Sequence, residues 1–164
     1  RTGNCTIEVD AIVPTREITQ DPILYNESTR ILQLMAGAHM FADQIELAHH
    51  YDAILFHGTG LGHLPIEDPN DDSPENVAMR EAISNYCSQG GIAVMTTLCI
   101  HGPVHLDVYS KGREQQELGI RGNHATLGPD AALIKLHFLL SSGQDIKAGW
   151  ATNLCGENQS SISN

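Results

Sequence analysis

The sequence predicts an α/β fold of three layers, a short parallel sheet of three to four strands flanked by helices, in a Rossmann-like arrangement. Three short apolar runs, at 30–35, 53–57 and 92–96, have the composition of buried strands. Segments with helical periodicity follow each of them. This alternation is typical of parallel βαβ units. A length of 164 residues suits a single domain with a sizeable core.

The first part of the chain, residues 1–29, is expected to be an irregular interdomain segment and edge piece. A short strand at 8–13, ended by Pro14, is its one candidate element. The chain begins at Arg1, without methionine, in a polar run. We therefore expect it to be a piece of a longer protein.

The first strand is expected at 30–35 and is followed by a predicted helix over 40–49. Phe41, Ile45 and Ala48 are spaced at i, i+4 and i+7 within this segment. That spacing places the three side chains on one apolar helical face.

The central strand, 53–57, runs into the glycine-rich sequence GTGLGHLP, which ends at Pro65. Such a loop at the carboxyl end of a parallel strand is a common ligand site in open α/β sheets, although it can also be a simple turn. The spacing G-x-G-x-G, with no helix directly behind it, does not fit a dinucleotide fingerprint. No phosphate-binding loop with its lysine occurs in the sequence.

A helix is predicted over 75–88, with Val77, Ile83 and either Tyr86 or Cys87 facing the core. A glycine pair after this segment ends the helix.

The third strand, at 92–96, is followed by an expected extended piece at 104–109 and a polar stretch with no assigned element. A strong helix is predicted over 130–140, with Leu133, Leu136 and Phe138 as core residues, and a weaker one over 144–151. Residues 156–164, rich in serine and asparagine, are expected to form a flexible tail.

Right-handed crossovers place the ends of the second and third strands at one edge of the sheet. Polar and sulfur-bearing side chains gather there in the sequence: Thr59, His63, Thr97, Cys99, His101 and His105. One hypothesis is a metal site formed by Cys99, His101 and His105, with His57 or His63 as the fourth ligand. The spacing of these residues matches no zinc pattern. We therefore expect no metal.

A Cys–His hydrolase built on Cys99 and either His101 or His63 is a second hypothesis. No cationic neighbour or helix N-terminus that would lower the pKa of the Cys99 thiol is evident. No cofactor is expected either.

The formal charge of −11 disfavours direct binding to nucleic acid or to anionic membranes. No run of residues is long and apolar enough to predict a membrane helix. The four cysteines, Cys5, Cys87, Cys99 and Cys155, form no CxxC pair. We expect buried free thiols and a cytoplasmic location.

Three ordered motifs carry a family resemblance: GTGLGHLP (58–65), IAVMTTLCIHGPVHLDVYSKGRE (92–114) and LGPDAALIKLHFLL (127–140). They resemble the asparaginase family, and most closely its archaeal branch, the D subunit of glutamyl-tRNA(Gln) amidotransferase. VDAIVPTREI near the start resembles the interdomain segment, and ATNLCGE resembles the carboxyl terminus. The resemblance covers the family's C-terminal domain, here 30–155.

The resemblance implies a second, N-terminal domain that carries the nucleophilic threonine in a TGGT motif, and a TDT motif beside it. Neither motif occurs in this sequence, so no catalytic residue is assigned to it. The chain also departs from the family pattern: His57 replaces a glutamate, Thr97-Leu98 replaces Ser-Gln, and His101 and Pro103 replace a tyrosine and an arginine. These departures bear on substrate choice.

By resemblance, the parent protein is expected to hydrolyse the side-chain amide of glutamine or asparagine, as the glutaminase subunit of a tRNA-dependent amidotransferase. The expected partners are a second copy in a homodimer, the N-terminal catalytic domain, and a tRNA-binding subunit. The loop would contact the amino-acid amide across the dimer interface through Thr59, Gly60, Gly62 and His63, with Tyr109 nearby. The alternative is a non-catalytic dimerisation or effector-binding domain.

Overall fold

The computed structural model describes residues 25–100 and 102–158. Its centre is a sheet of three parallel strands, β1 (Ile31–Met35), β2 (Ala53–Gly58) and β3 (Ala93–Thr97), in the order β1-β2-β3. This arrangement confirms the predicted α/β class. The strand bounds differ from the predicted ones by a single residue at the ends.

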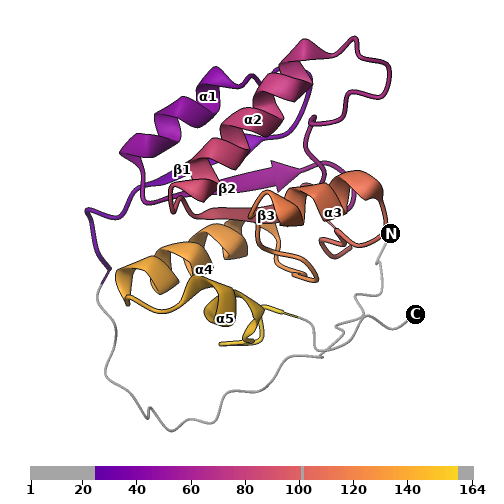
Figure 1. The fold of residues 1–164 in the computed structure, drawn as a ribbon. Helices are drawn as coiled ribbons and strands as arrows, with labels where there is room; N and C mark the ends of the chain where they lie inside the picture. The colour runs from indigo at the N-terminus through magenta and orange to yellow at the C-terminus, as the bar shows by residue number, and fades with distance from the viewer. Residues whose placement is uncertain (1–24, 101, 159–164) are drawn as a thin grey trace, which may run out of the picture.

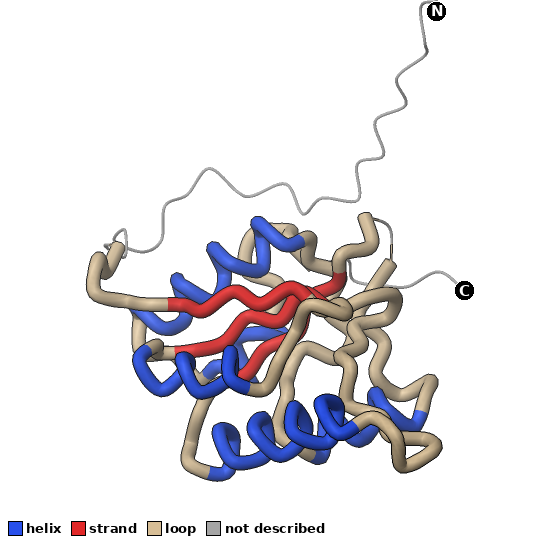
Figure 2. The backbone as a smooth tube through the Cα atoms, turned by 90° about the horizontal axis from the view of Figure 1, so that it is seen from above, coloured by secondary structure: helices blue, strands red, loops and turns tan. Residues whose placement is uncertain are grey.

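Helices cover both faces of the sheet, which gives the three layers seen in Figure 1 and, from above, in Figure 2. One face carries α1 and α2, and the opposite face carries α4 and α5. Helix α3 lies near the carboxyl ends of the strands. The bounds are α1 (Asp43–Glu46), the 3₁₀ turn η1 (Leu47–His50), α2 (Pro74–Ser88), α3 (Ser110–Glu117), α4 (Pro129–Ser141) and α5 (Ile146–Ala151).

Two apolar cores lie on the two faces of the sheet. On the α1–α2 side, Ile54 and Phe56 of β2 pack with Ile83 of α2. On the other side, Leu55 packs with Leu136 of α4. Every residue of β2 is buried, and burial on both faces explains why this strand is a continuous apolar run rather than an alternating one.

The outer edge of β3 is covered by the segment around Arg121. The Arg121 N–H donates to the carbonyl of Ala93 at 3.0 Å, and its carbonyl accepts from Met95 N–H at 2.6 Å. The next residue, Gly122, has φ +122°, and a Cβ there would lie 2.4 Å from the Met95 carbonyl oxygen. Glycine is therefore needed for this segment to approach the strand.

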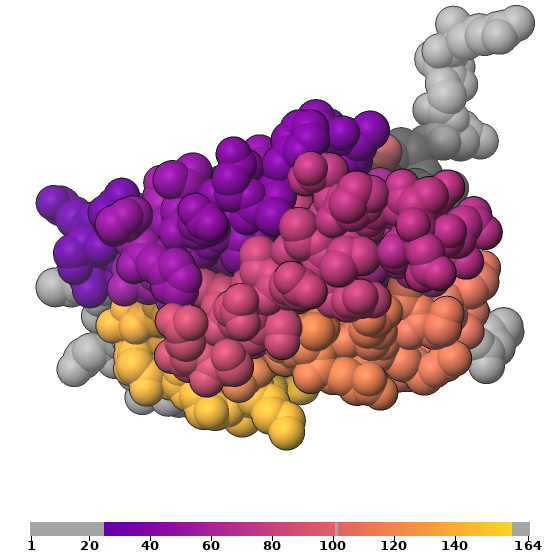
Figure 3. Space-filling model, turned by 45° about the horizontal axis from the view of Figure 1, so that its top comes forward, coloured from indigo at the N-terminus to yellow at the C-terminus, as the bar shows by residue number. Residues whose placement is uncertain are grey.

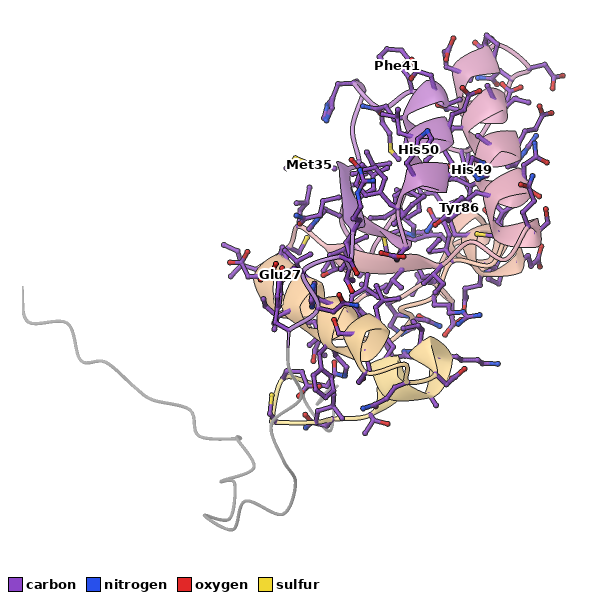
Figure 4. The ribbon with its side chains drawn as sticks, turned by 90° about the vertical axis from the view of Figure 1, so that its left-hand side faces the viewer. Glu27, Met35, Phe41, His49, His50 and Tyr86 are labelled. Atoms are coloured by element: carbon purple, nitrogen blue, oxygen red, sulfur yellow. The ribbon has the colours of Figure 1, made fainter. Side chains whose placement is uncertain are left out.

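The predicted single helix over 40–49 is wrong. Helix α1 begins only at Asp43, and a separate 3₁₀ turn follows it. Ile45 and Ala48 are buried as expected, but Phe41 precedes the helix and is 48% exposed, which Figure 4 shows at the outer end of α1. The N–H of Phe41 donates to the Gln44 side chain at 2.9 Å, so the chain turns before the helix starts.

The extended piece predicted at 104–109 is not a strand, and α3 occupies the polar stretch for which the sequence predicts no element. Helix α3 packs beside α2, where Arg80 and Glu114 form an ion pair at 3.3 Å. The space-filling view shows these two parts of the chain adjoining on one face (Figure 3).

Helix α2 buries Ile83 and Tyr86 as predicted, but its third buried position is Met79, whereas Val77 is only partly buried. Tyr86 also contacts His49 of η1 edge to face, with ring centroids 5.6 Å apart (Figure 4). This contact holds η1 against α2.

The last described residues are pinned to α4 by a buried ion pair. Lys135 is 4% exposed, and its Nζ lies 2.7 Å from Oε1 of Glu157 and also donates to the Thr152 carbonyl. Burial raises the pKa of Glu157, but hydrogen bonds from Lys135 and from the N–H groups of Leu154 and Cys155 lower that pKa more, to about 2. The proposed strand at 8–13 lies outside the described residues.

Candidate functional site

The glycine-rich loop is closed by hydrogen bonds between Thr59 and His63. The N–H of Thr59 donates to the His63 carbonyl at 3.1 Å, and its hydroxyl donates to the same oxygen at 3.2 Å. Gly60 and Gly62 between them have positive φ, +53° and +97°. The alternating glycines thus allow a tight turn directly after β2.

The end of β3 holds the tip of this loop. The Thr97 hydroxyl donates to the Gly60 carbonyl at 2.5 Å and accepts from the N–H of Cys99 at 3.1 Å. The two strand ends therefore meet, as their order in a parallel sheet predicts. Thr97 serves as the link between them.

Gln115 of α3 is the residue that fixes His63, and no pattern in the sequence singles it out. Its side chain is fully buried, and its Oε1 accepts from the N–H of Leu64 at 2.7 Å. Its Nε2 donates to the Gly62 carbonyl at 2.8 Å. The backbone on both sides of His63 is therefore anchored to one amide group.

The structure brings His63 and Tyr109 together. Their rings meet edge to face, with centroids 5.4 Å apart. Nε2 of His63 is buried and has no hydrogen-bond partner among the described residues. Burial, helped by the positive charge of Lys111 and opposed by Glu67, lowers the pKa of His63. The imidazole is therefore neutral at pH 7, with one N–H to donate.

His57 takes no part in this loop. It lies within β2, is 8% exposed, and its Nε2 is 3.2 Å from the side-chain oxygen of Gln33 on β1. Burial lowers the pKa of His57, and Asp130 opposes that effect. A buried, neutral histidine paired with a neighbouring strand has a structural role.

A second polar cluster, formed by His105, Asp107 and His124, differs from the metal set considered from the sequence. One candidate ligand atom from each residue lies within 4.8 Å of the other two. Cys99 is not part of this cluster, and His101 lies outside the described residues. Sequence reasoning missed His124 because this residue is far from Asp107 in the sequence. It also lies in a stretch for which no helix or strand is predicted.

The thiols are less buried than expected. Cys87 is partly buried, whereas Cys99 and Cys155 are exposed, and all three are free. Burial raises the pKa of the Cys87 thiol. Cys5 lies outside the described residues.

A short parallel sheet whose central strand leads into a glycine-rich loop with a fixed histidine defines an α/β domain with a loop site at the carboxyl edge of its sheet. Residues 30–149 match the model of the family described as "Glutaminase/Asparaginase C-terminal domain", and the chain belongs to this family. Among the described helices, none has the length and apolar character needed to cross a bilayer.

The chain is also similar in sequence to curated proteins. The chain is 34% identical over 137 residues to the D subunit of glutamyl-tRNA(Gln) amidotransferase from Thermococcus kodakarensis, covering 81% of this chain and 28% of the relative. The corresponding protein of Metallosphaera sedula is 31% identical over 133 residues, with 77% and 27% covered. The chain thus spans under a third of the length of these relatives.

Solved structures share the fold. The thermostable L-asparaginase from Thermococcus kodakarensis superposes with a TM-score of 0.67 at 24% identity, covering 80% of this chain and 38% of that one. L-asparaginase I from Vibrio cholerae gives a TM-score of 0.63 at 23% identity, covering 79% and 38%. The three-strand sheet with helices on both faces is therefore an arrangement that these proteins also contain.

Proposed function

We propose that this chain is the C-terminal domain of an amidohydrolase, the glutaminase subunit of a glutamyl-tRNA(Gln) amidotransferase. Its role is to present the loop from Thr59 to His63 to an amino-acid amide bound on an N-terminal catalytic domain. The family match and the similarity to the archaeal amidotransferase proteins support this proposal.

The observation that carries the proposal is the way His63 is held. Its backbone is fixed on both sides by Gln115, while its Nε2 has no partner among the described residues. A loop that only turned the chain would not need a buried amide group from another helix to fix the backbone on both sides of one histidine. Fixed polar groups with spare hydrogen-bonding capacity are what a ligand-contacting loop requires.

In this proposal Nε2 of His63 hydrogen-bonds the α-carboxylate of the amide substrate. Because Nε2 is buried beside Tyr109, which is 54% exposed, the tyrosine ring has to turn for the substrate to reach it. Tyr109 then acts as a positioning residue at the rim. Thr59, Gly60 and Gly62 shape the loop.

The reaction itself is assigned to the N-terminal domain. A threonine there attacks the carbon of the side-chain amide, ammonia leaves, and water hydrolyses the resulting acyl-enzyme. No residue of this chain supplies the nucleophile. The neighbouring copy in a homodimer would provide the catalytic domain that each loop completes.

The acidic character of the chain, −11 at pH 7, favours tRNA binding by a partner protein of the complex, because like charges repel phosphates. Free thiols at Cys87, Cys99 and Cys155 support a cytoplasmic location. No metal and no cofactor enter the proposed amide hydrolysis.

The test uses His63→Ala in the parent protein that carries both domains. A hydrogen bond to a charged group contributes about 1.5–3 kcal/mol, so KM for the amide should rise about tenfold to a hundredfold with an unchanged urea midpoint. Mixing this variant with a nucleophile-dead variant that keeps His63 should restore activity, because each site takes its loop from its partner.

His50→Ala is the matched control, since His50 is an exposed histidine on η1 and should leave KM unchanged. An unchanged KM in His63→Ala, or no recovery in the mixed dimers, would overturn the role of His63 and favour the non-catalytic alternative. Size measurements with and without the amide would then show whether the domain acts as an effector-dependent dimerisation unit.

A further inference from the structure

Three side chains that the amide hydrolysis does not use converge beside the glycine-rich loop. They are two imidazoles, from His105 and His124, and the carboxylate of Asp107. Nε2 of His124 lies 3.1 Å from Oδ2 of Asp107. The rings of the two histidines meet edge to face, with centroids 5.1 Å apart.

Backbone pairing brings His124 to the other two residues. The N–H of Val104 donates to the Ala125 carbonyl at 2.8 Å, and the N–H of His124 donates back to the Val104 carbonyl at 2.8 Å. The N–H of His105 donates to the Leu61 carbonyl in the glycine-rich loop at 2.9 Å. Two distant stretches of chain are thus locked side by side.

The distances suit a single small cation. An ion with bonds of about 2.0–2.2 Å to nitrogen and oxygen holds its ligand atoms roughly 3–4.4 Å apart. The 3.1 Å separation between His124 and Asp107 and the 4.8 Å limit over all three atoms are close to that range. Two imidazoles and one carboxylate favour a transition ion over Mg²⁺ or Ca²⁺, which prefer oxygen ligands.

The carboxylate is oriented by amide groups from two other residues. Asn123 Nδ2 donates to Oδ2 of Asp107 at 2.8 Å, and Gln116 Nε2 donates to Oδ1 at 3.0 Å. The two amides are themselves joined at 3.1 Å. Hydrogen bonds of this kind commonly orient metal-ligating carboxylates.

Two further features are independent of these contacts. His124 has φ +66°, a conformation that costs about 1–3 kcal/mol in residues other than glycine. Nδ1 of His105 is buried without a hydrogen-bond partner among the described residues. Strained backbone and unpaired buried polar atoms cluster at functional sites.

We propose that His105, Asp107 and His124 bind one divalent transition-metal ion of the Zn²⁺ class. The bound ion joins the segment after β3 to the segment before α4, and it steadies the glycine-rich loop through the hydrogen bond from His105 to Leu61. None of the three residues belongs to the loop from Thr59 to His63, so metal binding can be measured without the amide reaction.

The test titrates the metal-free 164-residue chain with Zn²⁺ by calorimetry and with Co²⁺ by visible absorption. We expect one ion per chain, Co²⁺ bands without thiolate charge transfer, and a higher melting temperature in the presence of Zn²⁺. His124→Asn and Asp107→Asn should each weaken binding at least tenfold. Asparagine tolerates the positive φ at 124 and keeps the size of Asp107.

His50→Asn is the matched control and should bind Zn²⁺ like the unsubstituted 164-residue chain, since His50 is an exposed histidine elsewhere on the surface. Circular dichroism and a urea midpoint verify that each variant is folded. The proposal is overturned if the parent chain binds no Zn²⁺, if binding survives both substitutions unchanged, or if Cys99→Ser rather than His124→Asn abolishes it.

Discussion

Nε2 of Gln115 donates a hydrogen bond to the carbonyl of Gly62 at 2.8 Å, across 53 positions in the sequence. The other end of the same amide accepts from the N–H of Leu64. Helix α3 is therefore attached to the glycine-rich loop by one side chain, and the position of His63 depends on a residue outside the loop.

Gln115→Ala should destabilise the protein by about 2–6 kcal/mol, because it leaves two buried backbone groups unpaired at about 1–3 kcal/mol each. Urea unfolding measures the loss. Glu117→Ala, at an exposed position of the same helix, should stay within about 0.5 kcal/mol of the parent chain. Equal effects of the two substitutions would show that Gln115 does not anchor the loop.

Gly112→Ala should be destabilising, although alanine is normally the better helix former by about 1 kcal/mol. A Cβ at Gly112 would lie 2.3 Å from the carbonyl oxygen of Leu106, so the backbone would have to shift. Gly128→Ala is the control: nothing lies within 4 Å of its Cβ, and the change should stay within about 1 kcal/mol. A stabilised Gly112→Ala would contradict the packing of α3 described here.

The ion pair of Glu157 with Lys135 should make stability depend on pH in the acid range. The folded pKa of Glu157 is about 2, below its ordinary value of 4.5. Its stabilising contribution is therefore complete above pH 4.5 and is lost as the pH falls toward 2. The stability difference between the parent chain and Glu157→Gln should narrow by about 2 kcal/mol from pH 6 to pH 3.

Urea midpoints at the two pH values measure that narrowing. Glu117→Gln, which removes an exposed carboxylate, serves as the control and should show no comparable change. A difference that stays constant with pH would mean that Glu157 ionises as freely in the folded chain as in the unfolded one.

The 164-residue chain alone should release no ammonia from glutamine or asparagine, because it contains neither a TGGT nor a TDT motif. A coupled ammonia assay on a preparation free of host asparaginase measures this. Turnover above the buffer blank would disprove the assignment of the nucleophile to another domain.

Strands β2 and β3 could be predicted because every residue in them is buried, which favours largely apolar runs. The edge strand β1 is only partly buried, but four of its five residues are apolar. Helix α3 could not be predicted, because the residues that it buries are Gly112 and Gln115. Neither has a large apolar side chain, so the segment carries no hydrophobic stripe. The helix is stabilised by tertiary contacts, of Gly112 with Leu106 and of Gln115 with the glycine-rich loop, which the sequence pattern does not reveal.

The sequence could likewise predict some residues of the polar sites and not others. Thr59 and His63 could be grouped from the sequence because they belong to one short loop, and the family resemblance added Tyr109. The convergence of His124 with His105 and Asp107 depends on the backbone pairing of Val104 with Ala125. No periodicity in the sequence marks that pairing. No periodicity marks the turn at 41–44 either. Phe41 has helical spacing to Ile45 in the sequence, but the turn leaves Phe41 outside the helix.

The order of the strands in the sheet, β1-β2-β3, is also their order along the chain. During synthesis, β2 leaves the ribosome when β1 is already available to pair with it, and β3 leaves when β2 is available. Of the three strands, only β1 has to wait with both edges open for a partner made later. The central strand, which is buried throughout and whose exposed edges would favour aggregation, can therefore pair along one edge as soon as it emerges.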